Sequence, residues 1–527
     1  SAAAAAVRMI LRKGVFMKLV TTVENGIVRG LPAADPFITL FKGIPFAAPP
    51  VGELRWRAPQ PAKSWEGVRD AFQFGPIAMQ AKPTLDPENG CSREWNADPD
   101  ISMSEDCLQL NIWTPSRTLT DKLPVYVWYY GGGLQAGNPS EMEYDGERLA
   151  RRGVVVVTVN YRVNVFGFLA HPELTAESPD APTNFGHLDQ LFGLKWVKRN
   201  IAAFGGDPDN ITIGGQSAGG MSVCALLVAP QAAGLFQKAI MESGIFKSPY
   251  GRVATQYPLA QAEETGRQFF KLLGVKTLSE ARSLSADFIR DKALESGVFW
   301  GTVDDGKFQI GKYEDEMLKK RAPVPLLFGR TTNEFTMGPN ADSIDGFKKV
   351  IARYGDKAQR ILELCHADEG IEAAKKYSAV SETDLAIRSL CAAEDRAHRS
   401  IPKYYYLFGA TIPGPDHPGA FHSSDLWFFF ETLAKCWRPF TGKHYDLARI
   451  MCNYWANFIK TGDPNGKDAD GTPMPEWPAY TEKKPAVMHF HEDPQKLGAK
   501  VEEPDELMKI FIDARVKGVS SDGTLGG

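Results

Sequence analysis

Residues 211–220, which read ITIGGQSAGG, decide the fold of this chain. The stretch begins with a short β-branched run that is typical of a buried strand, and small residues suited to a tightly packed helix follow it. Residues 215–219 match the pattern GxSxG, in which a serine sits on a sharp strand-to-helix turn. Glycines two residues on either side leave room for the neighbouring strand and helix. The stretch therefore predicts that the hydroxyl of Ser217 is lifted clear of a sheet.

The backbone after Ser217 is suited to stabilising negative charge. Ala218 would open the helix, where unsatisfied N–H donors and the helix macrodipole stabilise the oxygen of a tetrahedral intermediate. The string GxSxG also occurs by chance in glycine-rich chains, but here strand, turn and helix fall where the motif needs them. We therefore predict that Ser217 is a catalytic nucleophile.

The segments upstream indicate the architecture around this turn. Residues 124–129 and 154–160 are short runs that are apolar on both faces, as expected for strands covered by helices. Apolar residues recur every three or four positions from 188 to 201, which predicts an amphipathic helix on the sheet. We predict an α/β-hydrolase fold, with a large, mostly parallel central sheet, helices on both faces and helical excursions over the active site.

A glycine-rich segment, residues 131–133, follows the strand expected at 124–129. Without side chains in the way, the N–H groups of Gly132 and Gly133 can turn toward the same oxyanion as Ala218. This segment is the predicted second half of an oxyanion hole. A flexible surface turn is the alternative, and a phosphate loop is disfavoured because no GK[ST] follows.

The remaining sequence points to one domain. Residues 260–400 are mostly helical in pattern with one clear strand at 324–328, and an apolar helical stripe at 447–459 is best interpreted as core packing. No linker divides the chain into self-sufficient halves, and no repeat is visible. We predict a single domain over residues 17–515, after a tag-like or untidy leader at 1–16 and before a flexible tail at 516–527.

Composition excludes several classes of protein. A chain of 527 residues with 43% hydrophobic content can bury a large core, so overall disorder is excluded. The net charge is −4 and both signs are mixed along the chain, so the sequence shows no basic cluster that would bind nucleic acid. The longest apolar runs are far below the roughly 18 residues of a membrane-spanning helix. We expect a soluble protein. Because no secretory signal is recognisable, the expected compartment is the cytoplasm.

A serine nucleophile needs a histidine to take its proton and a carboxylate to orient that histidine. The chain order expected for this fold is serine, acid, histidine. The chain order alone does not decide which histidine is the base. Five lie late enough in the sequence: His417, His422, His444, His489 and His491.

Several further motifs resemble those of the type-B carboxylesterase family, which includes cholinesterases and some fungal lipases. They span residues 19–490 and form a highly specific set: FKGIPFAAPPVGELRW, SEDCLQLNIW, VWYYGGG, NYRVNVFGFL, NIAAFGGDPDNITIGGQSAGG and YWANFIKTGDPNG. The resemblance implies a Ser-His-Glu triad and ester hydrolysis.

Carried over position by position, the resemblance places the acid at Glu334, in GRTTNEF, and the histidine at His422, in GAFHSSDL. A loop glutamate and a structural histidine are the alternatives, with His417 a close rival. The family's oxyanion donors fall on Gly132, Gly133 and Ala218. The resemblance also implies a buried ion pair between Arg162 and Asp189, and a supporting role for Ser243 behind the triad, where a simple core hydroxyl is the alternative.

Some positions depart from the family pattern. Cholinesterases carry a glutamate just before the nucleophile, whereas Gln216 is neutral, which disfavours a cationic choline ester. Leu134 stands where the family often has a larger aromatic residue, which hints at a roomier acyl pocket. Trp95 loosely resembles the choline-stacking tryptophan of cholinesterases, with a loop anchor as the alternative.

The seven cysteines are an odd number without CxxC spacing, so neither a zinc site nor a dense disulfide framework is indicated. The partner that secreted family members provide for the cysteine of EDC would fall near Ala78, so Cys107 lacks it. A disulfide between Cys91 and Cys107 remains open, and the family's usual argument for export is weakened.

The expected activity is two-step acyl transfer on a small-molecule ester, with no metal or organic cofactor, because backbone dipoles meet the developing charge. The same triad could instead cleave a thioester, amide, carbamate or polyester. A non-catalytic, esterase-like binding module is a further alternative, although such relatives lack a triad member. Acyl and alcohol preference and oligomeric state are left open by the sequence.

Overall fold

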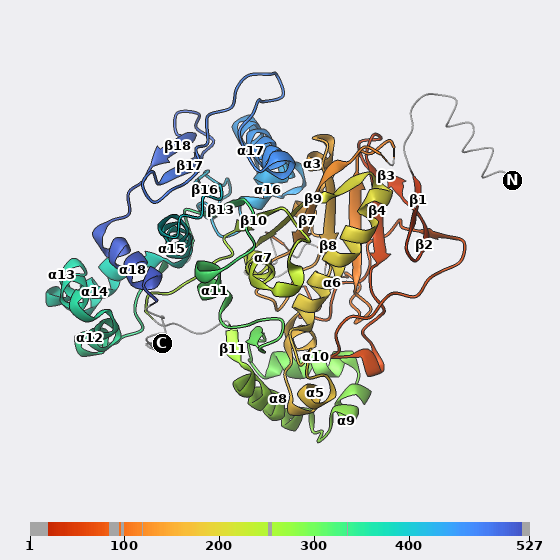
Figure 1. Cartoon of the computed structure of the whole chain (residues 1–527), viewed down its shortest axis with the longest axis horizontal. Helices are drawn as coiled ribbons and strands as arrows, with labels where there is room; N and C mark the ends of the chain where they lie inside the picture. Colours follow the sequence, from red (N-terminus) through yellow and green to blue (C-terminus); the bar gives the residue numbers. More distant parts are fainter. Residues whose placement is uncertain are drawn as a thin grey trace.

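A computed structural model describes residues 19–83, 94–95, 98, 100–118, 120–250, 256–334 and 336–518. Within them an 11-stranded sheet forms the centre of the molecule (Figure 1). Its strands, in spatial order, are β18 (Gly498–Val501), β17 (Ala486–Phe490), β16 (Lys403–Phe408), β13 (Leu326–Thr331), β10 (Lys238–Glu242), β9 (Gly206–Gln216), β7 (Leu123–Tyr129), β8 (Val155–Val159), β6 (Gln109–Thr114), β4 (Thr39–Pro45) and β3 (Leu31–Pro32).

The middle of this sheet is parallel and its edges are antiparallel. Neighbouring strands from β17 to β8 all run parallel, whereas β18 and the group β6, β4 and β3 pair antiparallel. The parallel strands are buried on both sides; all five residues of β8 are buried. This is the continuous apolar pattern that a sheet covered on both faces requires.

Helices cover both faces of the sheet. Along β7, Trp128 packs against Phe430, after α16 (Leu426–Phe429), with ring centroids 5.1 Å apart. The hydroxyl of the next residue, Tyr129, donates to the carbonyl of Gln190 on α6 (Phe185–Asn200). Because consecutive strand residues point to opposite faces, α16 and α6 lie on opposite sides of the sheet. The predicted α/β-hydrolase fold is confirmed.

The other helices of these two layers follow the same division. On the side of α16, α17 (Gly442–Thr461) contacts α16, β7 and α3 (Glu147–Arg151). On the side of α6, the helices that contact one another in series are α7 (Ala218–Val228), α11 (Tyr313–Lys319), α15 (Glu382–Arg396) and α18 (Glu506–Val516).

Two helical excursions extend from these layers (Figure 1). The first, at the lower edge of the view, contains α5 (Pro172–Glu177), α8 (Leu259–Leu273), α9 (Leu278–Ser283) and α10 (Ala286–Glu295). The second, at the left, contains α12 (Ile344–Ile351), α13 (Ala358–Leu364) and α14 (Ile371–Ser378) beside α18. The second has its own small core, in which Phe347, Ile361 and Phe511 are buried.

Element boundaries differ slightly from the expected ones. The strand expected at 324–328 is β13, which begins at Leu326 because Pro325, just before it, has no N–H to donate to the ladder. The helix expected from the stripe at 447–459 begins earlier, at Gly442, where Thr441 caps it. No helix in the described residues has the length and apolar character needed to cross a membrane. The expected leader at 1–16 and residues 519–527 of the expected tail lie outside the described residues.

Candidate active site

Ser217 lies on the turn between β9 and α7. Its φ of 53° is in the left-handed region, and its N–H donates to the carbonyl of Glu242 at 2.9 Å. A Cβ on Gly215 would lie 2.3 Å from the carbonyl carbon of Gly219, and one on Gly219 would lie 2.0 Å from the carbonyl oxygen of Tyr129. Both flanking positions therefore require glycine, and the serine sits on a strained turn at the carboxyl end of β9.

The loop that contains Gly132 and Gly133 passes beside Ser217. A Cβ on the preceding residue, Gly131, would lie 3.2 Å from Cβ of Ser217. Gly132 has a φ of 102°, and a Cβ there would lie 2.2 Å from the carbonyl oxygen of Ala136. Only glycine fits this path, which brings the main chain of the loop up to the serine.

Three backbone N–H groups are left available near Ser217. Among the described residues, no hydrogen bond has the N–H of Gly132, Gly133 or Ala218 as its donor. Ala218 is the first residue of α7, so its N–H is one of the donors that a helix leaves without an internal partner. This set of donors suits an oxygen that gains negative charge.

Side-chain amides hold the same loop in place. Gln80 makes two hydrogen bonds with the backbone of Gly137, at 2.8 and 3.0 Å. Asn164 donates its side-chain amide to the carbonyl of Gln135 at 3.1 Å and its backbone N–H to the carbonyl of Leu134 at 2.6 Å. The position of the loop is thus fixed without using the three N–H groups.

Glu334 and His422 form a close pair, although 88 residues separate them. Nδ1 of His422 lies 2.9 Å from Oε2 of Glu334, whose side chain is 1% exposed. The other carboxyl oxygen accepts from the N–H and the hydroxyl of Thr331, at 3.4 and 3.2 Å. Burial acts to raise the pKa of Glu334, but His422, assisted by Ser243 and Thr331, lowers it overall. Glu334 is therefore an ionised carboxylate that can orient the imidazole.

Gln216 makes a contact that the sequence did not predict. Its side-chain Nε2 lies 3.3 Å from Nε2 of His422. The ionised carboxylate of Glu334 can only accept, so Nδ1 of His422 carries the ring proton and Nε2 is left as an acceptor, which matches the amide N–H of Gln216. In this tautomer the imidazole is ready to accept a proton at Nε2.

The other late histidines have different surroundings. His417 is exposed. His444 bonds with Thr441 at the start of α17, His489 pairs with Glu502 at 2.7 Å, and His491 lies 3.1 Å from Glu492. Of the five candidates, His422 is the one that lines a cavity with Ser217.

That cavity has a volume of about 320 Å³. It is lined by Trp95, Gly131, Gly132, Ala136, Gly137, Glu141, Tyr144, Gln216, Ser217, His422, Ser423 and Leu426. Leu134 is not among these residues; its side chain is fully buried in the core. Glu141 and Tyr144 carry no sequence signal that marks them as lining residues. Burial raises the pKa of Glu141 to about 7, so its charge varies near neutral pH.

A second cavity, of about 500 Å³, adjoins the first, because Trp95 and Glu141 line both. Its outer wall carries Asp98 and Asp100. The ring of Trp95 also packs edge-on against Phe421, the residue before His422, with centroids 6.2 Å apart. Trp95 therefore stands at the junction between the catalytic cavity and this outer space.

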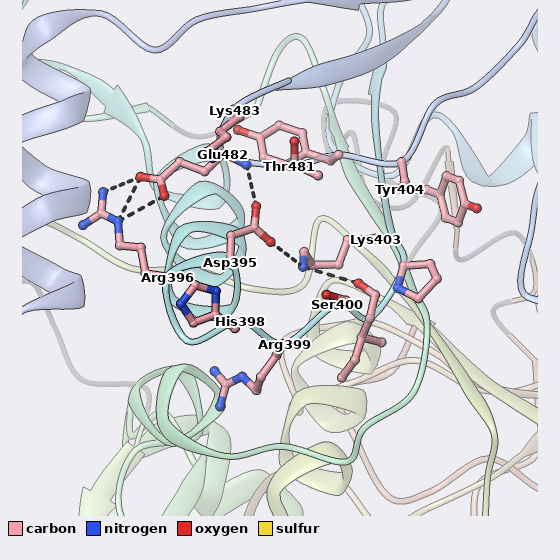
Figure 2. Close-up of a pocket in the computed structure, with 14 residues that line it drawn as sticks. Asp395, Arg396, His398, Arg399, Ser400, Lys403, Tyr404, Thr481, Glu482 and Lys483 are labelled. Atoms are coloured by element: carbon pink, nitrogen blue, oxygen red, sulfur yellow. Dashed lines mark hydrogen bonds and ion pairs between the residues drawn. The ribbon is translucent and has the colours of Figure 1, made fainter.

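A larger cavity, of about 680 Å³, lies at the start of β16, whereas the loop that carries His422 follows the end of this strand. Figure 2 shows the residues that line it. Charged pairs dominate it: Lys403 bonds to Asp395 at 3.1 Å, and Arg396 pairs with Glu482. Ser217, Glu334 and His422 do not line it, so size does not identify the site.

Three structural expectations concern residues near the site. Arg162 and Asp189 form a buried pair, with Nη2 and Oδ1 2.7 Å apart. Cys107 is a buried, free thiol, and Cys91 lies outside the described residues. Ser243 is fully buried and lowers the pKa of Glu334, although its hydroxyl has no hydrogen bond of normal length among the described residues.

A mostly parallel sheet with helices on both faces, and a serine on the turn after a central strand, define an α/β hydrolase. The model of the carboxylesterase family matches residues 17–507. The chain therefore belongs to the carboxylesterase family, and it is a serine hydrolase of carboxylic esters.

Known relatives agree with this assignment. The chain is 35% identical to the para-nitrobenzyl esterase of Bacillus subtilis (strain 168) over 490 residues, which cover 88% of this chain and 93% of that protein. It is 32% identical to the cholinesterase of Mus musculus over 539 residues, covering 94% and 87% of the two chains. A solved structure of a PNB esterase superposes with a TM-score of 0.75 at 30% identity, covering 94% of this chain and 99% of the other.

Proposed function

We propose that Ser217, His422 and Glu334 act as a catalytic triad that hydrolyses carboxylic esters through an acyl-enzyme intermediate. The observation that carries this proposal is the 2.9 Å contact between His422 and Glu334, at a cavity that Ser217 also lines. A histidine oriented by a buried carboxylate is the base that a serine hydroxyl needs at neutral pH.

The first step acylates the enzyme. Oγ of Ser217 attacks the ester carbonyl while Nε2 of His422 takes the hydroxyl proton, so that a tetrahedral intermediate with a negative oxygen forms. The N–H groups of Gly132, Gly133 and Ala218 bind that oxygen. The C–O bond to the alcohol then breaks, and the alcohol leaves with the proton from His422.

The second step releases the acid. A water molecule gives a proton to His422 as it attacks the acyl carbon, and the C–O bond to Ser217 breaks as Oγ takes that proton back. Throughout both steps Glu334 stays ionised and stabilises the imidazolium, which its lowered pKa favours. Backbone dipoles supply the charge stabilisation in this scheme.

The substrate preference follows from Gln216. A neutral amide beside the serine provides no charge to attract a cationic alcohol, so we propose that neutral esters are preferred to choline esters. Trp95 and Tyr144 add aromatic surface to the same cavity.

The test is hydrolysis of short-chain p-nitrophenyl esters by Ser217→Ala. Turnover is expected to fall at least 10³-fold, because the nucleophile is lost. Ser222→Ala is the matched control: it removes a hydroxyl from α7, whose partners are Ala218 and Gln190, and is expected to keep its activity. Unchanged turnover in folded Ser217→Ala would end the proposal, and failure of the wild-type chain to react with a fluorophosphonate would favour a binding module.

A further inference from the structure

Two carboxyl groups lie fully buried behind the proposed triad. Glu242 is the last residue of β10, and its carbonyl holds the N–H of Ser217. Asp425 follows His422 by three residues and comes directly before α16. Neither side chain takes part in the proposed mechanism.

Each carboxyl group has one hydrogen-bonded and one bare oxygen. Nε1 of Trp455 donates to Oε1 of Glu242 at 2.6 Å, and the hydroxyl of Tyr406 donates to Oδ2 of Asp425 at 2.7 Å. Within the described part of the chain, Oε2 of Glu242 and Oδ1 of Asp425 have no hydrogen-bond partner. Both donors are neutral, so neither compensates a full negative charge.

The groups around the pair come from several elements. Tyr126 on β7 and Tyr406 on β16 feel the charge of Glu242, while Glu334 and His422 act on Asp425. Of these ionisable groups only His422 can become a cation. Two ionised carboxylates without cationic partners in the protein interior would carry a large desolvation penalty, so the pair must retain a proton.

Burial raises the pKa of both carboxyl groups, but to different extents. Burial, together with the charge of Asp425, raises the pKa of Glu242 far above its usual range. Burial raises the pKa of Asp425 only to about 6; Tyr406 and His422 oppose this rise, and Glu334 adds to it. At neutral pH the favoured state is a protonated Glu242 and an ionised Asp425.

We propose that Glu242 and Asp425 hold one proton between them at neutral pH, and that the charge left on Asp425 stabilises the imidazolium of His422 during acyl transfer. Asp425 is thus a positioning residue that acts through His422, and Glu242 keeps the pair from carrying two charges. This inference rests on the proposed triad.

The sign of the pH effect follows from the raised pKa of Asp425. As the pH falls through about 6, Asp425 takes up a proton, and Glu334 is then the remaining carboxylate of this group that stabilises His422. The imidazolium is then less stable, so catalysis weakens more than protonation of His422 alone would cause. Removing this charge permanently should lower the rate at neutral pH and let His422 lose its proton at a lower pH.

The experiment compares Asp425→Asn with wild type in kcat and kcat/KM for p-nitrophenyl acetate between pH 5 and 9. We expect kcat at pH 7.5 to fall about tenfold, and the acid limb of kcat/KM to move about one unit to lower pH, since both report the same lost charge interaction. Glu314→Gln is the matched control, because it neutralises a buried carboxyl on α11 that is bonded to Gln256. It is expected to leave the rate and the acid limb unchanged.

A spectroscopic measurement keeps the test decisive if Asp425→Asn folds poorly. The infrared carbonyl band of a protonated carboxylic acid at pH 7 should be weaker in Glu242→Gln than in wild type. Glu242→Gln should also keep its acid limb, because Asp425 still titrates. No infrared change in Glu242→Gln, or a wild-type rate and pH profile in folded Asp425→Asn, would overturn the inference. If instead Ser217 in wild type resists fluorophosphonate, the triad itself fails.

Discussion

The side-chain amide of Gln216 lies 3.3 Å from Nε2 of His422, the ring nitrogen that faces the nucleophile in the proposed mechanism. The contact joins the residue before Ser217 to a loop 206 positions later. The contact is compatible with the tautomer that Glu334 imposes, in which Nδ1 carries the proton and Nε2 accepts.

Gln216→Glu should make the acid limb of kcat/KM move upward by about one pH unit. A carboxylate beside Nε2 stabilises the charged imidazole, so His422 loses its proton only at a higher pH. The variant should also hydrolyse a choline ester better relative to a neutral ester of the same acyl group. An unchanged limb and an unchanged ester ratio would show that position 216 has no electrostatic influence on the base or the alcohol.

Glu334→Gln should lower kcat about 10³-fold or more, because the amide cannot stabilise the imidazolium and favours the wrong tautomer. The chain offers a matched control in Glu502→Gln, since Glu502 also forms a close pair with a histidine, His489, at 2.7 Å. That variant should keep kcat within about twofold. Comparable losses in both variants would point to general destabilisation rather than to a triad.

Gly132→Ala should reduce kcat at least 100-fold with a smaller effect on KM, because the added Cβ would lie 2.2 Å from the carbonyl oxygen of Ala136 and displace the oxyanion donors. Gly153→Ala separates this effect from backbone strain, since Gly153 also has a positive φ, of 82°, but open space around it. The control should cost about 1 kcal/mol of stability without loss of kcat. Normal kcat in Gly132→Ala would remove this glycine from the oxyanion hole.

Asp189→Asn should destabilise the fold by about 3–5 kcal/mol in urea titrations, because it leaves Arg162 buried without its counter-charge. Asp70→Asn, which breaks an ion pair with Arg29 whose side chains are 47% and 45% exposed, should cost at most about 1 kcal/mol. Equal midpoints for the two variants would contradict a structural role of the buried pair.

The fold was largely predictable because its signals are local. Glycines at 215 and 219 report the tight turn directly, and the apolar runs at 124–129 and 154–160 report strands buried on both faces. The start of β13 was predicted two residues too early, because Pro325 has no N–H to donate and the strand begins at Leu326.

The site was predictable only in part. The local motifs identified Ser217 and the glycine loop, but they did not decide which of five histidines is the base. Only the family resemblance pointed to His422 and Glu334. Contacts between distant side chains, such as that of Gln216 with His422 or the burial of Glu242 beside Asp425, have no local signal. They depend on how β9, β10 and the loop after β16 meet in space.

Reaction with a fluorophosphonate probe, followed by mass mapping of the chain, tests whether Ser217 is the nucleophile and His422 its base. We expect one modified residue, Ser217, together with stoichiometric loss of esterase activity and no labelling of folded His422→Ala at the same exposure time. A label on another serine, or full activity in protein modified at Ser217, would contradict it.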